Sequence, residues 1–193
     1  MRITKASENI IPLIGELHLN SFDRNHFTSR FDRELLGKYL KLLIADNKYC
    51  YTAFEDGQNR LTGYIICGDK SNEAVNKFIK NNFLKVAILL LKNPSFIIEK
   101  ANEVFARLNP FGLKKSIAKM RVFIIAIDQN SQGKGTGNLL LGELESDLKR
   151  NKIKNYGLSV RKGNRQAINF YEKNHFQIEY ENKKSIFYIK NIS

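Results

Sequence analysis

The feature that most constrains the fold of this chain is a continuous apolar segment that leads directly into a glycine-rich loop and an amphipathic helix. Residues 121–127 read RVFIIAI, and an uninterrupted apolar run is typical of a central strand that is buried on both faces. Three glycines then fall within five residues, at Gly133, Gly135 and Gly137. Leucines at helical spacing predict a helix over residues 137–150. This order of strand, loop and helix indicates an α/β domain in which a helix N-terminus can hold an anion.

The remaining sequence supplies the other elements of a single mixed-sheet α/β domain over residues 1–193. Residues 71–118 read as a helical insertion with breaks at Pro94 and Pro110, followed by a core at residues 119–178. Apolar runs predict strands over residues 2–5, 48–55, 61–67, 156–160, 176–180 and 186–189. Amphipathic spacing predicts helices over residues 7–20, 32–45 and 165–174.

Length and composition exclude several classes of protein. A chain of 193 residues with 42% hydrophobic and 26% charged residues has the size of one globular domain. No apolar stretch approaches the roughly 18 residues of a membrane-spanning helix, and no apolar region of a secretory signal follows the N-terminus. Cys50 and Cys67 lie in apolar, strand-like runs, and the three histidines show no metal-ligand spacing. We therefore expect a cytoplasmic protein with buried free thiols and no metal.

The charge balance is strongly basic. Lys and Arg number 32 against 19 Asp and Glu, a net charge of +13, and residues 70–121 alone hold eleven basic and three acidic side chains. Such a balance attracts nucleic acid, an anionic membrane surface or a phosphorylated ligand, and it also fits a basic protein that is merely soluble. The sequence has no aromatic-studded RNA-binding pattern, so we expect no nucleic-acid partner.

The glycine loop narrows the kind of anion that could bind. Its backbone N–H groups can turn to one side, and Lys134 adds a full positive charge. A Walker loop is excluded because Gly135 follows Lys134, and the dinucleotide fingerprint is excluded because Asn138 stands where its third glycine belongs. What remains is a Gln-x-x-Gly-x-Gly pattern from Gln132 to Gly137. By itself this pattern fits either a phosphate cradle or a tight strand–helix turn.

A second motif, after the next predicted strand, makes the pattern specific. Residues 164–176 read NRQAINFYEKNHF. Together the two motifs resemble the GNAT superfamily of N-acetyltransferases, whose pattern is Gln/Arg-x-x-Gly-x-Gly/Ala, a strand, and Asn-x-x-Ala-x-x-(apolar)-Tyr-x-x-x-Gly-Phe. The close resemblance covers residues 119–178, and the rest of the chain fits the family topology more loosely. The matching positions are Gln132, Gly135, Gly137, Asn164, Ala167, Phe170, Tyr171 and Phe176.

The resemblance implies a fold and an activity. The fold is a mixed central sheet flanked by helices, in which the strands at 121–127 and 156–160 splay apart around acetyl-coenzyme A, with a bulge in the earlier strand. The activity is transfer of the acetyl group to an amine, usually a primary one. The pantetheine arm is implied to pair with backbone at Ile125, Ala126 and Ile127. The positions implied for the pyrophosphate are Gln132, Gly133, Lys134, Gly135, Thr136, Gly137 and Asn138.

The same resemblance implies roles for two side chains near the acetyl group. Tyr171 matches the family position that protonates the leaving thiolate, and its alternative role is an aromatic residue on the buried face of a helix. Asn164 is implied to bind the pantetheine arm or a water, and asparagine also suits the cap of the helix that follows. The two roles of Asn164 are compatible with each other.

Two positions depart from the family pattern. Many members carry a glutamate general base near the start of the central strand, where this chain has Arg121. An arginine cannot accept a proton, so the base lies elsewhere or is a chain of waters. His175 stands where the family has glycine, and a positive φ would disfavour any other residue there. By analogy with the family's acceptor site the candidate bases are Glu16, His18, Asp23 and His26, although His18 fits a helix-face residue at least as well.

The lead hypothesis is an N-acetyltransferase that uses acetyl-coenzyme A and acts on the primary amine of a small molecule, with an amino sugar as one candidate. The basic charge favours an acceptor that bears phosphate or carboxylate over a basic peptide tail. The alternatives are a protein acetyltransferase that modifies a lysine or an N-terminal amine, and a basic binding module that has lost turnover. The insertion at 71–118 is interpreted as a cap over the acceptor site, a homodimer contact or an amphipathic membrane-surface segment.

Overall fold

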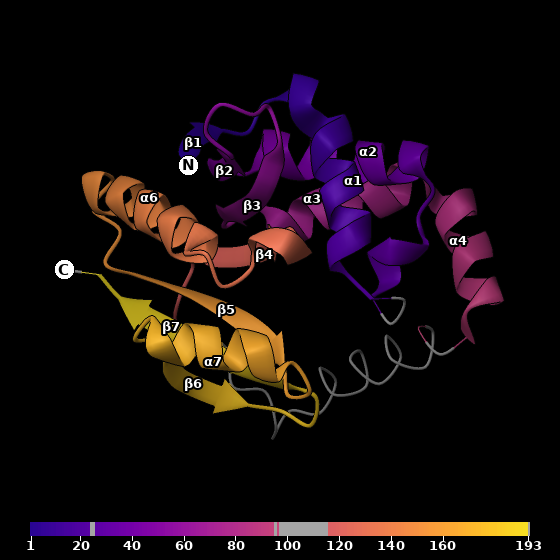
Figure 1. Ribbon diagram of the computed structural model, residues 1–193. Coiled ribbons are helices and arrows are strands. Elements are labelled where there is room, and N and C mark those ends of the chain that lie inside the picture. The colour runs from indigo at the N-terminus through magenta and orange to yellow at the C-terminus, as the bar shows by residue number, and fades with distance from the viewer. Residues whose placement is uncertain (24–25, 95, 97–115, 193) are drawn as a thin grey trace.

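The chain forms one mixed seven-stranded sheet. The computed structural model describes residues 1–23, 26–94, 96 and 116–192. The strands are β1 (Arg2–Lys5), β2 (Tyr49–Phe54), β3 (Leu61–Gly68), β4 (Arg121–Ile127), β5 (Asn155–Arg161), β6 (Gln177–Glu181) and β7 (Ser185–Asn191) (Figure 1). Their order across the sheet is β1-β2-β3-β4-β5-β7-β6. The pair β4–β5 is parallel, and every other neighbouring pair is antiparallel.

Helices cover both faces of this sheet. They are α1 (Ile11–Ser21), α2 (Arg33–Asp46), α3 (Ser71–Asn81), α4 (Phe83–Lys92), α6 (Thr136–Arg150) and α7 (Arg165–Lys173). Buried side chains of α1 to α4 belong to one hydrophobic core, and those of α6 and α7 belong to a second core. The sheet therefore separates two helical layers, and the order of elements confirms the predicted mixed-sheet α/β domain.

The two cores meet through the central strand β3, which is buried along its whole length. Successive side chains of a strand point to opposite faces. Tyr64 and Ile66 accordingly pack in the core of α1 to α4, whereas Ile65 and Cys67 pack in the core of α6 and α7. A strand with helices on both faces is mostly apolar, and in β3 the one polar exception, Thr62, donates a hydrogen bond to the Ala53 carbonyl at 3.0 Å.

Both cysteines are buried and free, as the sequence predicted. Cys50 packs in the core of α1 to α4 and Cys67 in the core of α6 and α7, so the two thiols lie on opposite faces of the sheet. Burial raises the pKa of both thiols. Both side chains therefore stay protonated and act as small hydrophobic residues.

One prediction about local structure is wrong, and one break between helices was missed. The sequence predicted that residues 121–127 are buried on both faces, but Phe123 is 38% exposed and side chains at alternate positions of β4 are only partly covered. The break predicted at Pro94 is confirmed, since α4 ends at Lys92, but the sequence missed an earlier break at Asn82, between α3 and α4. There the Asn82 side chain donates a hydrogen bond to the Phe78 carbonyl at 3.0 Å and ends α3. The predicted break at Pro110 lies outside the described residues.

The described part of the insertion leaves one apolar surface uncovered. Val86 buries one side of α4 against the core, while Leu84 and Leu91 on the other side are each 75% exposed and Phe83 is 64% exposed. None of the described helices has the length and apolar character needed to cross a membrane. A cap, a dimer contact and a membrane-surface segment stay alternative predictions for this insertion, of which residues 97–115 lie outside the described part.

The chain turn after α7 contains backbone strain that a substitution can relieve. His175 has φ = +63°, a left-handed conformation that costs an L-residue about 1–2 kcal/mol. We expect His175→Gly to raise the free energy of unfolding by about 0.5–1 kcal/mol, because glycine's greater freedom in the unfolded chain offsets part of the relief. Urea unfolding measures this change. Lys173→Gly, in the regular last turn of α7, is the control and should instead destabilise by about 0.5–1 kcal/mol. A loss of stability in both variants would contradict the expected strain.

Candidate active site

The parallel strands β4 and β5 separate soon after they meet. Their register contains the single pair Arg121↔Gly157, and the Gly157 N–H donates to the Met120 carbonyl at 2.9 Å. Both strands lie wholly within the described residues, and β4 runs on to Ile127 without a further pair to β5. Backbone groups along this side of β4 are consequently free of a strand partner and can pair with an extended ligand.

A bulge in β4 accompanies this separation. Opposite β3, Ile66 pairs with Ile124 and the next residue, Cys67, pairs with Val122, so Phe123 has no partner. An extra residue of this kind bends the strand and increases its local twist. The bulge and the loss of pairing to β5 are the features that the resemblance implied for a splayed pair of central strands.

The three predicted backbone positions lie in the part of β4 that β5 does not pair. They are Ile125, Ala126 and Ile127. The Ile127 carbonyl accepts hydrogen bonds from Ser21 Oγ and Gln132 Nε2, each at 3.4 Å. Bonds of this length are weak, so an extended ligand can replace them.

The glycine loop leads from β4 into the N-terminus of α6. Gly133 and Gly135 have φ = +74° and φ = +85°, conformations that other residues adopt at a cost. Gly135 caps α6, which begins at the buried Thr136. The first N–H groups of a helix have no acceptor within it, and they form the positive end of its dipole. With the exposed Lys134 beside them, these residues fit a pyrophosphate group.

Contacts between the loop and α7 hold the two sequence motifs together. A Cβ atom on Gly137 would lie 2.9 Å from Cζ of Phe170, so only a glycine lets these residues approach this closely. Gln166 Nε2 donates to Gln132 Oε1 at 2.8 Å across the same junction. The spacing between the two motifs thus reflects a direct packing contact.

Asn164 caps α7 as the sequence suggested. Its Oδ1 accepts a hydrogen bond from the Ala167 N–H at 3.0 Å. This bond satisfies one of the unpaired donors in the first turn of the helix. The capping interaction engages the carbonyl oxygen of the side chain, and the amide nitrogen has no hydrogen bond to a described residue.

Tyr171 lies on the buried face of α7. Its ring packs edge-on or tilted against the rings of Phe170, Phe176 and Tyr188. Burial raises the pKa of its hydroxyl well above the usual value, so the group is protonated at neutral pH. Among the described residues the hydroxyl has no hydrogen-bond partner. Its proton is therefore available for donation.

The candidate bases near α1 do not gather into one exposed group. His18 is fully buried, with Nδ1 at 2.5 Å from Tyr64 Oη and Nε2 at 2.6 Å from Thr28 Oγ1. Burial, reinforced by the neighbouring His26, lowers the pKa of His18 to about 3. A neutral ring with both nitrogens engaged is a structural polar group. His26 lies next to His18, with ring centres 6.0 Å apart, and its Nδ1 lies 2.8 Å from the same Thr28 Oγ1. Glu16 instead forms a surface ion pair with Arg33 at 3.3 Å, and Asp23 follows α1.

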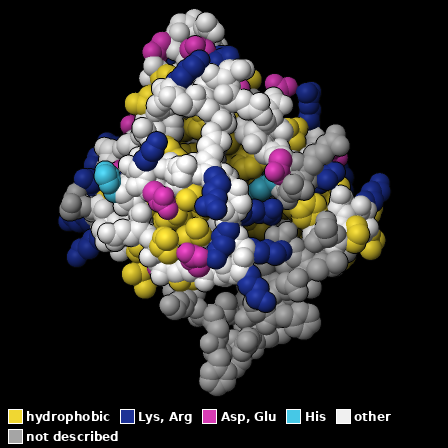
Figure 2. Space-filling model, turned by 60° about the horizontal axis from the view of Figure 1, so that its bottom comes forward, with side chains coloured by type: hydrophobic (Ala, Val, Ile, Leu, Met, Phe, Trp, Pro, Cys, Tyr) yellow, Lys and Arg dark blue, Asp and Glu magenta, His cyan; other side chains and the backbone are white. Residues whose placement is uncertain are grey.

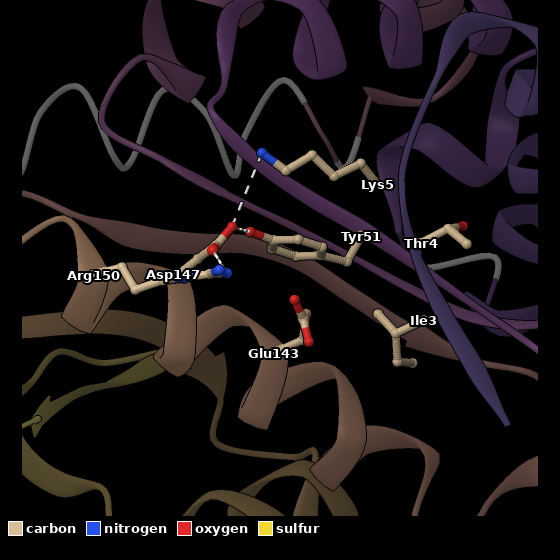
Figure 3. Close-up of a pocket in the computed structure, with 7 residues that line it drawn as sticks. All are labelled: Ile3, Thr4, Lys5, Tyr51, Glu143, Asp147 and Arg150. Carbon is tan, nitrogen blue, oxygen red and sulfur yellow. Dashed lines mark hydrogen bonds and ion pairs between the residues drawn. The ribbon is translucent and has the colours of Figure 1, made fainter.

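A polar hollow of about 250 Å³ lies at the opposite end of α6 from the glycine loop (Figure 3). Asp147 at its centre accepts hydrogen bonds from Tyr51 and Arg150 and lies 3.9 Å from Lys5 Nζ. These partners lower the pKa of Asp147, with the bond from the Tyr51 hydroxyl as the largest cause. None of the residues that line the hollow belongs to the predicted site. The hydrogen bond from Tyr51 and the ion pair with Lys5 link Asp147 on α6 to β2 and β1.

Comparisons with known proteins agree with this geometry. The family model described as "Acetyltransferase (GNAT) family" matches residues 13–176. The chain belongs to the GNAT family. This membership makes it an acyltransferase whose acyl donor is acetyl-coenzyme A. No protein with a curated description matched the sequence.

Solved structures share the fold at low sequence identity. PaiA N-acetyltransferase from Thermoplasma acidophilum, solved in complex with coenzyme A, has a TM-score of 0.62 at 16% identity, with 98% of each chain covered. The ribosomal-protein-S18-alanine N-acetyltransferase from Escherichia coli has a TM-score of 0.58 at 14% identity, covering 100% of this chain and 94% of that one. An N-acetyltransferase from Staphylococcus aureus Mu50 has a TM-score of 0.61 at 12% identity, covering 100% and 98%. At these identities the likeness shows the fold alone.

The buried His18 predicts a pH dependence of stability. Its pKa is about 3 in the folded chain against 6.5 for an ordinary histidine, so below 6.5 the unfolded chain binds a proton that the folded chain does not. Stability should therefore fall as the pH drops, by up to about 1.4 kcal/mol per pH unit from this group. Chemical unfolding between pH 7 and about pH 5, above the usual carboxyl range, measures the slope.

The control for this slope is the exposed His175. His18→Gln should flatten the dependence on pH, whereas His175→Gly should leave it unchanged. An equal slope in wild type and His18→Gln would show that His18 titrates normally in the folded chain.

Proposed function

We propose that this chain transfers the acetyl group of acetyl-coenzyme A to the primary amine of a small molecule in the cytoplasm, with an amino sugar as a candidate acceptor. The observation that carries the proposal is the single register pair between β4 and β5, with the glycine loop and the N-terminus of α6 following the unpaired end of β4. This arrangement offers unpaired strand backbone to an amide-containing arm and a positive helix end to its phosphates.

The proposed binding residues follow the length of the donor. Backbone groups of Ile125, Ala126 and Ile127 pair with the pantetheine arm, and the Asn164 side chain, which has an amide nitrogen to donate, lies beside it. The pyrophosphate rests on the backbone N–H groups of the loop, with Lys134 as an added charge. The loop positions are Gln132, Gly133, Lys134, Gly135, Thr136, Gly137 and Asn138.

The proposed role of Tyr171 is that of general acid. Attack of a neutral amine on the thioester carbonyl expels a thiolate, and the hydroxyl of Tyr171 donates its proton to that sulfur. The hydroxyl is protonated at neutral pH and has no hydrogen-bond partner among the described residues, and both features support this role. The proton that the amine loses passes to solvent or to a base reached through water, since Arg121 replaces the glutamate that many relatives use.

The basic surface supports an acceptor that carries negative charge. Lys and Arg side chains gather in the middle of the face drawn in Figure 2, with carboxylates scattered among them. Such a field attracts anionic small molecules and repels basic peptide tails. Acetylation of a protein amine is the second candidate, because one structural neighbour is named for acetylation of a ribosomal-protein alanine.

The first experiment is thermal unfolding with acetyl-coenzyme A, free coenzyme A or ATP. A ligand at 100 times its dissociation constant adds about 2.7 kcal/mol, which raises the Tm of a domain of this size by a few degrees. We expect a clear rise with both coenzymes and little change with ATP. An equal rise with all three ligands would show that the loop binds anions in general and is not specific for coenzyme A. The release of free coenzyme A thiol is then measured with amino sugars and with peptides that carry a free N-terminus or a lysine. Faster release with one class identifies that class as the acceptor.

The role of Tyr171 predicts a specific kinetic loss. Tyr171→Phe should lower turnover roughly 10- to 1,000-fold and leave coenzyme binding intact, because only the acid is removed. Thiol release measures turnover, and the thermal shift measures binding. Tyr188→Phe removes a second phenol from the same core and should keep near-normal turnover. Unchanged turnover in Tyr171→Phe would remove this residue from the mechanism.

A further inference from the structure

The helix α4 carries an apolar stripe on its outer surface. Leu84, Ile88 and Leu91 are 75%, 52% and 75% exposed, and Phe83 extends the stripe at the N-terminal end with 64% exposure. The first three residues are spaced by four and three positions, so they lie on one face of the helix. The helix itself lies at the outer edge of the molecule, beside the layer of α1 to α3 (Figure 1).

Contacts on the other side of α4 fix which face points outward. Val86 is buried in the core of α1 to α4, and Leu89 and Leu90 pack against the same core. Lys85 Nζ lies 3.0 Å from Glu34 Oε2 and joins the helix to α2. The core therefore uses one side of α4 and leaves the stripe uncovered. A contiguous exposed apolar surface of this kind marks an interaction site.

The charges of α3 and α4 indicate the partner. Residues 71–92 contain one acidic side chain, Glu73, and four lysines, at Lys77, Lys80, Lys85 and Lys92. Lys92 directly follows the stripe, is exposed and forms no ion pair with a described residue. A lysine can lay its apolar stem along such a stripe while its ammonium group reaches an anion. Apolar side chains beside lysines match the boundary between acyl chains and phosphates in an anionic bilayer.

We propose that α4 rests on the surface of an anionic lipid bilayer, with Leu84, Ile88 and Leu91 at the level of the acyl chains and Lys92 at the level of the phosphates. A helix of 10 residues is too short to span a bilayer, so the contact is peripheral. Its strength depends on the buried apolar area together with the attraction of the lysines to the lipid charge.

Charge argues against two other occupants of the stripe. A second copy of this surface would bring two basic faces together, which repel each other. Residues 97–115, which follow in the chain, contain four basic and two acidic side chains and therefore add positive charge as well. An anionic bilayer is the occupant whose charge complements that of α3 and α4.

Sedimentation with lipid vesicles tests the proposal. The vesicles consist of phosphatidylcholine alone or with about 30% phosphatidylglycerol. We expect binding at least about 10-fold stronger to the anionic vesicles, weakened severalfold between about 50 and 300 mM salt. Absence of binding to anionic vesicles would overturn the proposal. So would a dimer, measured by analytical ultracentrifugation, that dissociates when Leu84 and Leu91 are both replaced by glutamine.

Paired variants assign the binding to the stripe. Leu84→Gln combined with Leu91→Gln should weaken binding to anionic vesicles at least about 10-fold, because both changes remove apolar area. The control combines Ile117→Gln with Ile178→Gln, two side chains near β6 that are 74% and 52% exposed, and it should bind as the wild type does. An equal loss in the control would overturn the proposal, because exposed apolar residues in general would then be the cause.

A second pair tests the lysine. Lys92→Gln should weaken binding to anionic vesicles about threefold to fivefold, whereas Lys149→Gln, an exposed lysine on α6, should change it little. Equal effects of the two changes would contradict a specific role of Lys92. All variants should keep the rise in Tm with coenzyme A, which shows that they are folded. Vesicle binding needs no donor, so failure of coenzyme A to bind the wild type would contradict the proposed function and not this proposal.

Discussion

The departure of β4 from β5 is the constraint on which the rest of the site depends. A sheet normally satisfies the backbone groups of its central strands through their neighbours. Here one register pair holds the two strands, and β4 continues with a free side. The bulge at Phe123 supplies the bend, and the mixed sheet tolerates the loss because β3 pairs with β4 along its other side. The free backbone is what a donor with an amide-rich arm needs.

Packing between the loop and α7 fixes the position of this opening. Gly137 allows Phe170 to come within a distance that no side chain would permit, so the N-terminus of α6 and the start of α7 are held together. Because Asn164 caps α7 and Tyr171 lies on its buried face, the glycine loop and the proposed acid belong to one packed unit. The packing of α6 against α7 therefore sets the distance between the glycine loop and Tyr171.

His18 and Arg121 differ in how completely the fold satisfies their hydrogen bonding. His18 and Arg121 are both polar residues at positions where an apolar residue would pack. Both nitrogens of His18 have partners, and burial keeps the ring neutral. Arg121 keeps one donor without a partner among the described residues. The sequence made His18 a candidate base and excluded Arg121 as one, and the structure shows that His18 is a satisfied, neutral structural group.

The sequence by itself determined the order of elements, because hydrophobic periodicity is a local property: Arg121–Ile127 and Arg2–Lys5 were predicted to the residue. It also determined the glycine loop, since the backbone angles at Gly133 and Gly135 demand that residue type. It did not determine the exposure of Phe123, the break at Asn82 or the burial of His18, which depend on which strands and helices meet. The contact of Arg121 with β5, β6 and β7 joins residues 36 to 66 positions apart in the chain. Tertiary structure alone decided that contact, because no local pattern records which distant groups will leave a donor unpaired.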